Sequence, residues 1–167
     1  GAGLERWCLM FQNVDSNFDT DLFTPIIRHI EELCGMLYES QKEFKVIADH
    51  IRAITFAIAD QASFDNVGRG YILRRLLRRS IRMGKHLGLN EPFMYKLVSD
   101  VVDIMNESYP YLKSRRSDIE VAVLEEEKLF FKTLDAGEKR LNELVKNSTD
   151  GKISGEDAFK LYDTYGF

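Results

Sequence analysis

The sequence predicts an all-α protein: a bundle of about six helices that includes one long helix near residues 115–146. Three observations lead to this fold class. Apolar residues recur at intervals of three and four through most of the chain, no segment shows the alternation of a half-buried strand, and turn-forming residues separate the periodic segments. With 167 residues, 44% of them apolar, the chain can bury one core.

The first half of the chain predicts three helices. One begins near Leu4, after the glycine-rich GAG, and is followed by the turn-like stretch NVDSNFDTD. The apolar residues from Phe23 to Leu37 fall on one side of a second helix. Those from Phe44 to Ile58 form the stripe of a third, which ends at Asp60. These stripes are the first candidates for the core.

A long loop and a basic helix come next. The segment 61–70, QASFDNVGRG, is rich in helix breakers, and long loops between helices often carry function. The helix from Tyr71 to Leu87 then places arginines on one arc and ends at Gly88. Its inward-facing residues are expected to be Leu73, Leu76, Leu77, Ser80, Gly84 and Leu87.

The second half predicts three further helices. Asn90, followed by Glu91 and Pro92, signals a helix start, and that helix continues to the break at 108–110. In the long helix the apolar spacing is about three and a half residues, which also permits coiled-coil packing. Ser154 is the expected cap of the last short helix, GEDAFKLYD.

Composition excludes several classes of protein. No apolar run approaches the ~20 residues that a membrane span needs, and GAGLERWCLMF is charged where a secretory signal is apolar, so a cytoplasmic protein without a membrane partner is expected. Cys8 and Cys34 form no CxxC pair, and the three histidines are scattered. We therefore expect two buried free thiols, no disulfide framework and no metal site.

Positive charge is concentrated in one segment of an acidic chain. From Val67 to Asn90 there are seven cationic side chains and no acidic one, so the other residues together carry −11 to give the net charge of −4. We call these seven residues the basic stripe: Arg69, Arg74, Arg75, Arg78, Arg79, Arg82 and Lys85. Guanidinium groups bind phosphates well, which favours nucleic acid as the ligand. The alternative is that the stripe pairs with acidic residues of the long helix, such as Glu125 to Glu127, or is simply solvated.

Two further polar residues are candidates for a site. Asn66 places an amide beside the basic helix, although asparagine is also a common turn former. Asp163 lies between Tyr162 and Tyr165, where a carboxylate can equally be a helix cap. No Ser/His/Asp, Cys/His or paired-carboxylate pattern is present, so the sequence indicates no self-sufficient catalytic site.

Five segments, in order and at the same approximate spacing, resemble the alanyl-tRNA synthetase family of class II aminoacyl-tRNA synthetases: GAGLER, NVDSNFDTDLF, VIADHIRA, NVGRGYILRRLLRRSIR and AFKLYDTYGF. GAGLER looks like motif 3, the strand-to-helix element at the end of the catalytic core, whose arginine contacts the ATP phosphates. The resemblance thus implies that residues 1–20 end the catalytic core and that residues 21–167 form a helical tRNA-recognition domain. It assigns Gly3, Glu5 and Arg6 to ATP binding.

The same resemblance implies roles for the loop and the basic stripe. In that family, an asparagine before the arginine helix and an aspartate near LYDTYGF contact the G·U wobble pair of the tRNA acceptor stem. They match Asn66 and Asp163. The chemistry suits such a pair, because its guanine offers a 2-amino group in a shallow minor groove and an oxygen can accept from it. The basic stripe would hold backbone phosphates and set the register.

The expected function is therefore tRNA recognition within an enzyme that attaches alanine to tRNA with ATP and Mg. Motifs 1 and 2, the editing domain and its zinc ligands are missing from the sequence, so the fragment is expected to be monomeric, inactive and without a cofactor of its own. Two alternatives remain open. The helix 118–145 could pair with a partner helix in a protein-interaction module, or the chain could be an autonomous ATP-binding enzyme that forms an adenylate.

Overall fold

The computed structural model describes residues 1, 3–147 and 152–165, without the side chains of Asn147 and Asp163. The described residues form seven α-helices, one 3-10 turn and no strand, so the predicted all-α class is confirmed. The elements are α1 (Leu4–Gln12), η1 (Asn17–Asp19), α2 (Thr24–Cys34), α3 (Lys42–Ala59), α4 (Gly68–His86), α5 (Met94–Met105), α6 (Tyr111–Asn147) and α7 (Gly155–Tyr165).

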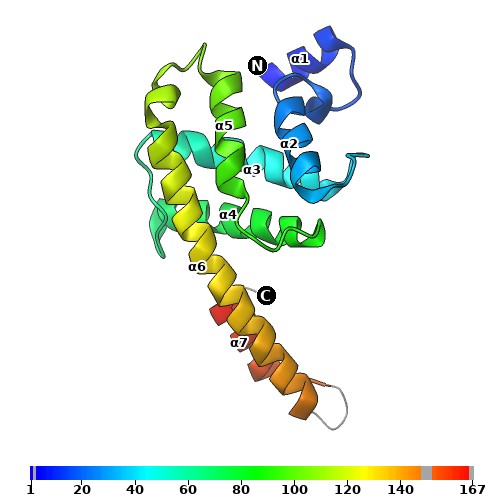
Figure 1. Cartoon of the computed structure of the whole chain (residues 1–167), viewed down its shortest axis with the longest axis vertical. Coiled ribbons are helices and arrows are strands. Elements are labelled where there is room, and N and C mark those ends of the chain that lie inside the picture. The colour runs from blue at the N-terminus through cyan, green and yellow to red at the C-terminus, as the bar shows by residue number, and fades with distance from the viewer. Residues whose placement is uncertain (2, 148–151, 166–167) are drawn as a thin grey trace.

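Most helices surround α3, and α6 extends beyond them. Figure 1 shows α2, α4 and α5 gathered around α3, with the first half of α6 against this bundle and its second half projecting away beside α7. The stripe predicted for α3 is the centre of the core, because Phe44, Ile47, Ile51 and Ile54 are fully buried. The predicted long helix is confirmed, with bounds slightly wider than expected.

Gly84 and Glu127 hold α4, α5 and α6 together. A Cβ on Gly84 would lie 2.4 Å from the ring of Phe93, so only glycine lets α4 approach so closely. The buried carboxylate of Glu127 in α6 accepts hydrogen bonds from the backbone N–H groups of Phe93 (3.0 Å), Met94 (2.9 Å) and Tyr95 (3.0 Å), which start α5. Burial raises the pKa of Glu127 to about 7, although the three N–H groups favour its ionised form.

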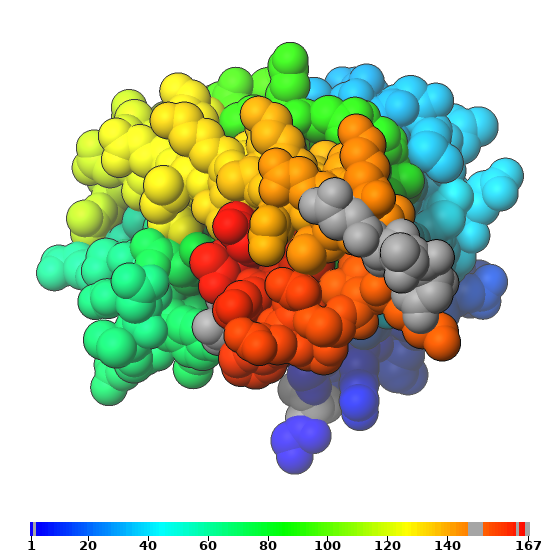
Figure 2. All heavy atoms as spheres, turned by 90° about the horizontal axis from the view of Figure 1, so that it is seen from below, coloured from blue at the N-terminus to red at the C-terminus, as the bar shows by residue number. Residues whose placement is uncertain are grey.

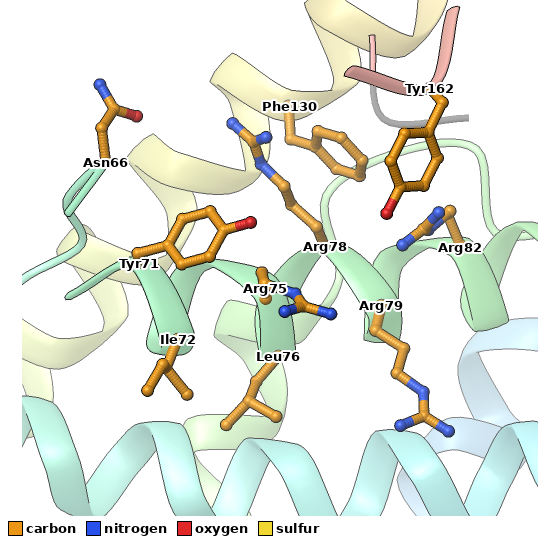
Figure 3. Close-up of a pocket in the computed structure, with 10 residues that line it drawn as sticks. All are labelled: Asn66, Tyr71, Ile72, Arg75, Leu76, Arg78, Arg79, Arg82, Phe130 and Tyr162. Carbon is orange, nitrogen blue, oxygen red and sulfur yellow. The ribbon is translucent and has the colours of Figure 1, made fainter. Parts of the chain in front are cut away.

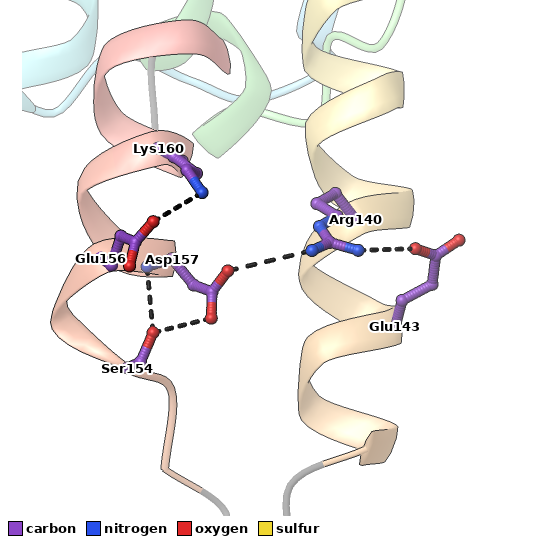
Figure 4. Close-up of polar contacts among 6 residues, drawn as sticks. All are labelled: Arg140, Glu143, Ser154, Glu156, Asp157 and Lys160. Atoms are coloured by element: carbon purple, nitrogen blue, oxygen red, sulfur yellow. Dashed lines mark hydrogen bonds and ion pairs between the residues drawn. The ribbon is translucent and has the colours of Figure 1, made fainter.

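α7 is fixed to the second half of α6 by one buried side chain and a set of polar contacts. Leu161 is buried, and Arg140 of α6 lies between Glu143 (3.4 Å) and Asp157 (3.8 Å), as Figure 4 shows. Ser154 caps α7 as predicted, because its hydroxyl accepts from the backbone N–H of Asp157 at 3.1 Å.

Several details differ from the sequence-based expectation. α4 begins at Gly68, so the glycines belong to its first turn, and α5 begins at Met94 because Glu127, and not Asn90, binds its first N–H groups. Gly1 and Gly3 are not in a strand, since a strand needs a hydrogen-bonding neighbour and the described residues offer none.

Cys8 and Cys34 are free thiols but are partly exposed and not buried, because α1 and the end of α2 lie at the surface. Within the described residues, no helix combines the length and the apolar character that crossing a membrane requires.

Candidate nucleic-acid interface

Six of the seven residues of the basic stripe divide into a partly buried row and an exposed row along α4, and the seventh, Arg82, is partly buried and lines the pocket described below. Three members of the stripe face α6 and are partly buried: Arg74, Arg78 and Lys85. Arg69, Arg75 and Arg79 are exposed, and within the described part of the chain they form no ion pair. The alternative that the arginines pair with the acidic long helix is therefore correct for the first row, and the second row faces solvent.

Glu126 of α6 is the partner that organises the first row. Its side chain is only 6% exposed. The Nη2 of Arg74 donates to Oε2 of Glu126 at 2.9 Å, and the Arg74 Nε lies 2.7 Å from Oε1 without a hydrogen-bonding angle. Arg78 is a looser partner at 4.0 Å, and its guanidinium carbon lies 5.0 Å from the centre of the Phe130 ring. Burial lowers the pKa of Arg78, and the charge of Glu126 opposes this effect.

Lys85 forms the corresponding link at the far end of the row. Its ammonium group pairs with Glu138 of α6. Two acidic residues of one helix thus fix the angle at which α4 presents the rest of the stripe. Two further acidic residues of α6 act elsewhere, since Glu120 pairs with Arg116 in α6 itself and Glu127 caps α5.

A pocket of about 450 Å³ opens beside the exposed row (Figure 3). It is formed by α4, the loop before it, α6 and α7, and Figure 2 shows α7 lying over this face beside α6. The lining residues are Asn66, Tyr71, Ile72, Arg75, Leu76, Arg78, Arg79, Arg82, Phe130 and Tyr162. In Figure 3 the hydroxyl groups of Tyr71 and Tyr162 point toward the arginines from two different elements.

The aromatic lining was not predicted from the sequence. Tyr71 was assigned only as a helix start, yet its ring lies 5.7 Å from the guanidinium carbon of Arg75 one turn later. The spacing of four residues between them was the available signal. Leu76, predicted to face the core, is only half-buried because it lines this pocket. Tyr162 could not be placed beside α4 without knowing how α7 packs.

Asn66 lies on a closely packed loop and is bound by one side chain of α4. A Cβ on Gly70 would lie 2.5 Å from the carbonyl oxygen of Ser63 and 2.6 Å from the Cβ of Asp65, so glycine is needed where the loop turns onto α4. The exposed amide of Asn66 accepts a hydrogen bond at its Oδ1 from Nη1 of Arg74, at 2.5 Å. The predicted proximity of Asn66 to the basic stripe is thus present in the structure.

Asp163 lies in α7, immediately after Tyr162 in the chain. Its side chain is outside the described part of the structure, but that of its neighbour Tyr162 is described. Asn66 and Tyr162 line the same pocket from opposite ends of the sequence. The role expected for Asp163 therefore stays a prediction.

A separate, smaller cavity of about 200 Å³ lies beside α1 and contains the three residues that the resemblance assigns to ATP binding. Gly3, Glu5 and Arg6 line it together with residues of η1, α2 and α3. Glu5 accepts from Nη2 of Arg52 at 2.5 Å, and backbone hydrogen bonding and Arg52 lower its pKa. Arg6 is exposed.

The arrangement suits binding more than catalysis. A cationic pocket with aromatic walls and an adjacent amide matches the phosphates, bases and groove edges of a nucleic acid. In the described residues, no three His, Cys, Asp or Glu side chains gather as metal ligands would.

The chain is similar along its whole length to known tRNA synthetases. Residues 1–167 match the family described as tRNA synthetases class II (A). Over its whole length the chain is 53% identical to the alanine–tRNA ligases of Staphylococcus aureus strains JH9, Newman and N315. The chain spans only 20% of the length of these relatives.

Proposed function

Because this chain belongs to the class II tRNA synthetase (A) family and is similar to alanine–tRNA ligases along its whole length, we propose that it is the tRNA-recognition part of an enzyme that attaches alanine to tRNA with ATP. The observation that carries the proposal is the pocket beside α4, which exposed arginines, two tyrosines and the Asn66 amide line together. In this proposal residues 1–20 end the catalytic core and residues 21–167 form the recognition domain.

The exposed members of the basic stripe bind the RNA backbone. Arg69, Arg75 and Arg79 form no ion pair within the described residues, and only Arg79 is close enough to a carboxylate, that of Asp49, for its charge to lower that group's pKa. Their charge is therefore available for phosphates. Arg78 and Arg82 line the pocket and complete the contact. Arg74 and Lys85 contribute less to phosphate binding, because Glu126 and Glu138 already match their charges.

Asn66 and Asp163 read the G·U wobble pair of the acceptor stem. An amide or carboxylate oxygen accepts from the guanine 2-amino group, which lacks its usual partner in a wobble pair. The exposure of Asn66 and its place on the pocket edge support this role. For Asp163 the support is its position in α7 directly after a pocket residue.

The cavity near α1 contributes to the ATP site of the whole enzyme. Arg6 is exposed and can hold a phosphate oxygen, whereas the carboxylate of Glu5 is occupied by Arg52 and positions α1 on α3. Gly3 lines the same cavity. ATP and its Mg ion would supply the activation chemistry, and this chain would contribute a single phosphate contact to it.

The test is binding of acceptor-stem minihelices that differ only in a G·U or a G·C pair. Asn66→Ala should reduce the preference for G·U by about 1–3 kcal/mol, as loss of other base-edge contacts does. Asn90→Ala is the matched control, since Asn90 is also an exposed loop asparagine but bonds only the backbone of Gly88. Equal loss of affinity for both stems in Asn66→Ala would exclude the reading role.

A further inference from the structure

We propose that Glu126 and Arg74 are positioning residues for base-pair reading, because the buried carboxylate fixes the guanidinium and the guanidinium fixes the amide of Asn66. The inference rests on the proposed function, in which Asn66 reads the pair. It assigns Arg74 a task different from phosphate binding, and it gives a role to Glu126, which lies inside the fold and cannot touch RNA.

The first step is that Glu126 is a rigid anchor. It lies in the middle of α6, next to Glu127, which is itself held by three backbone N–H groups of α5. Only 6% of its side chain is exposed. A carboxylate this deeply buried requires a cationic partner, and Arg74 of α4 is the closer of its two.

The second step is that one guanidinium serves both neighbours. Nε and Nη2 of Arg74 face Glu126, and Nη1 donates to Oδ1 of Asn66. The group is planar, so fixing two nitrogen atoms also fixes the direction of the third. The side chain of Arg74 is only 14% exposed and its charge is matched by that of Glu126. Arg74 is therefore poorly placed to bind a phosphate and well placed to hold the amide of Asn66 in one orientation.

The third step is the effect on Asn66. A free asparagine on an exposed loop rotates among several conformers, and ordering it on binding costs free energy. With one lone pair of Oδ1 bound to Arg74, the second lone pair and the Nδ2 hydrogens remain for the RNA. Figure 3 shows the Asn66 side chain standing at the edge of the pocket, on the side of Arg78. The contact thus orders the amide before RNA arrives.

The chain contains a matched control for this arrangement. Lys85 and Glu138 also join α4 to α6. Lys85 is roughly 16 Å further along α4 than Arg74, so it is remote from the amide. Glu138→Gln removes a link between the same two helices without touching Asn66.

The experiment measures dissociation constants of the G·U and G·C stems for the 167-residue chain and its variants. Arg74→Lys keeps the charge but loses the planar fork, and Glu126→Gln keeps the shape but loses the charge. The preference for G·U is the dissociation constant of the G·C stem divided by that of the G·U stem. Both variants should lower this ratio by at least ~fivefold, toward the Asn66→Ala value, with little change in the constant of the G·C stem. In an Asn66→Ala background, Arg74→Lys should have no further effect on the ratio.

Glu138→Gln should leave the ratio unchanged, and thermal unfolding followed by circular dichroism shows whether each variant is folded. The positioning role is overturned if folded Arg74→Lys keeps the full ratio, or if it weakens both stems equally. If Asn66→Ala also leaves the ratio unchanged, the proposed reading function itself fails. If Asn66→Ala removes the preference and Arg74→Lys does not, only the positioning role fails.

Discussion

Glu127 shows at the scale of one residue how burial controls ionisation. Its pKa is raised to about 7, above the ordinary value of 4.5. The folded chain therefore binds this proton more tightly than the unfolded chain does. The resulting stability is fully present below pH 4.5 and is lost as the pH rises through 7.

The stability of the folded chain should therefore decrease with pH through the ionisation of Glu127. Between pH 4.5 and pH 7.5 the free energy of unfolding of the natural chain should fall by roughly 3 kcal/mol relative to Glu127→Gln, which cannot titrate. Urea unfolding of both proteins at several pH values measures the difference, and the comparison cancels the titration of all other groups. Parallel pH profiles for the two proteins would contradict this prediction. They would show that the three N–H donors outweigh burial and keep the pKa of Glu127 near its ordinary value.

The exposed arginines give a second prediction at this scale. Arg75→Ala or Arg79→Ala should weaken both minihelices equally and reduce the slope of log K against log salt by about 1 each, because each removes one phosphate contact. Anisotropy titrations at several salt concentrations measure the slope. Arg116→Ala is the control, since Arg116 is an exposed arginine of α6 that pairs with Glu120. An unchanged slope in both stripe variants would place the RNA elsewhere.

Which arginines face solvent was not predictable from the sequence. The spacing of the basic residues indicated one arc of α4, and within that arc Arg74, Arg78 and Lys85 face α6. Whether a residue of this arc meets water or Glu126 depends on the rotation of α4 against α6, which is set by contacts such as Gly84 on Phe93. Local periodicity contains no information about that rotation.

At the scale of elements, the sequence predicted a helix in each segment where the described residues form one, and its error at the start of α5 lies where a distant residue decides the boundary. α5 begins at Met94 because Glu127, more than thirty residues later, accepts its first N–H groups. Ser154 caps its own helix, and that boundary was predicted correctly. A cap supplied by a residue a few positions away can thus be predicted from the sequence. A cap supplied by a residue of another helix cannot.

Gly70 allows the loop that carries Asn66 to pack closely against the start of α4. Gly70→Ala should push the loop that carries Asn66 away from α4, because its Cβ would overlap the backbone of Ser63 and Asp65. We expect a loss of about 1–3 kcal/mol in unfolding free energy, as for other overpacked sites, together with a weaker preference for the G·U stem. Urea unfolding and minihelix binding measure the two effects.

Gly155→Ala is the matched control for that change, since a Cβ there meets nothing within 4 Å at the start of α7. It should be neutral or slightly stabilising, because alanine favours a helix more than glycine does. If Gly70→Ala behaves like the control, the loop adjusts freely and Asn66 is not held as described.

At the scale of the whole molecule, the pocket joins residues from opposite ends of the chain. Tyr71 and Tyr162 line it together, and only the packing of α7 on α6 brings them there. The sequence could indicate the chemistry of each segment, and the resemblance of AFKLYDTYGF to a known family indicated that its residues belong with Asn66. The aromatic wall itself needed the tertiary structure.

The packing of α6 decides whether this helix could bind a partner helix, as the interaction-module alternative requires. Its periodic apolar residues are buried within the chain itself, against α3, α4 and α5: Ile119, Val123, Phe130 and Leu134. A coiled-coil seam needs these positions open to a partner. The large apolar side chains that α6 does expose are Tyr111, Val121, Leu129 and Val145, and their intervals of ten, eight and sixteen residues do not form the repeat of a heptad seam.

We therefore expect the chain to sediment as a monomer over a wide range of concentrations, with no change in the variant Val121→Ala/Leu129→Ala. Removing exposed apolar side chains alters neither the core nor a seam, so the free energy of unfolding should change by less than about 0.5 kcal/mol. A mass that rises with concentration in the natural chain but not in this variant would show that α6 binds a helix. Because apolar association is insensitive to salt whereas phosphate binding weakens with it, repeating both measurements at high salt separates the two functions.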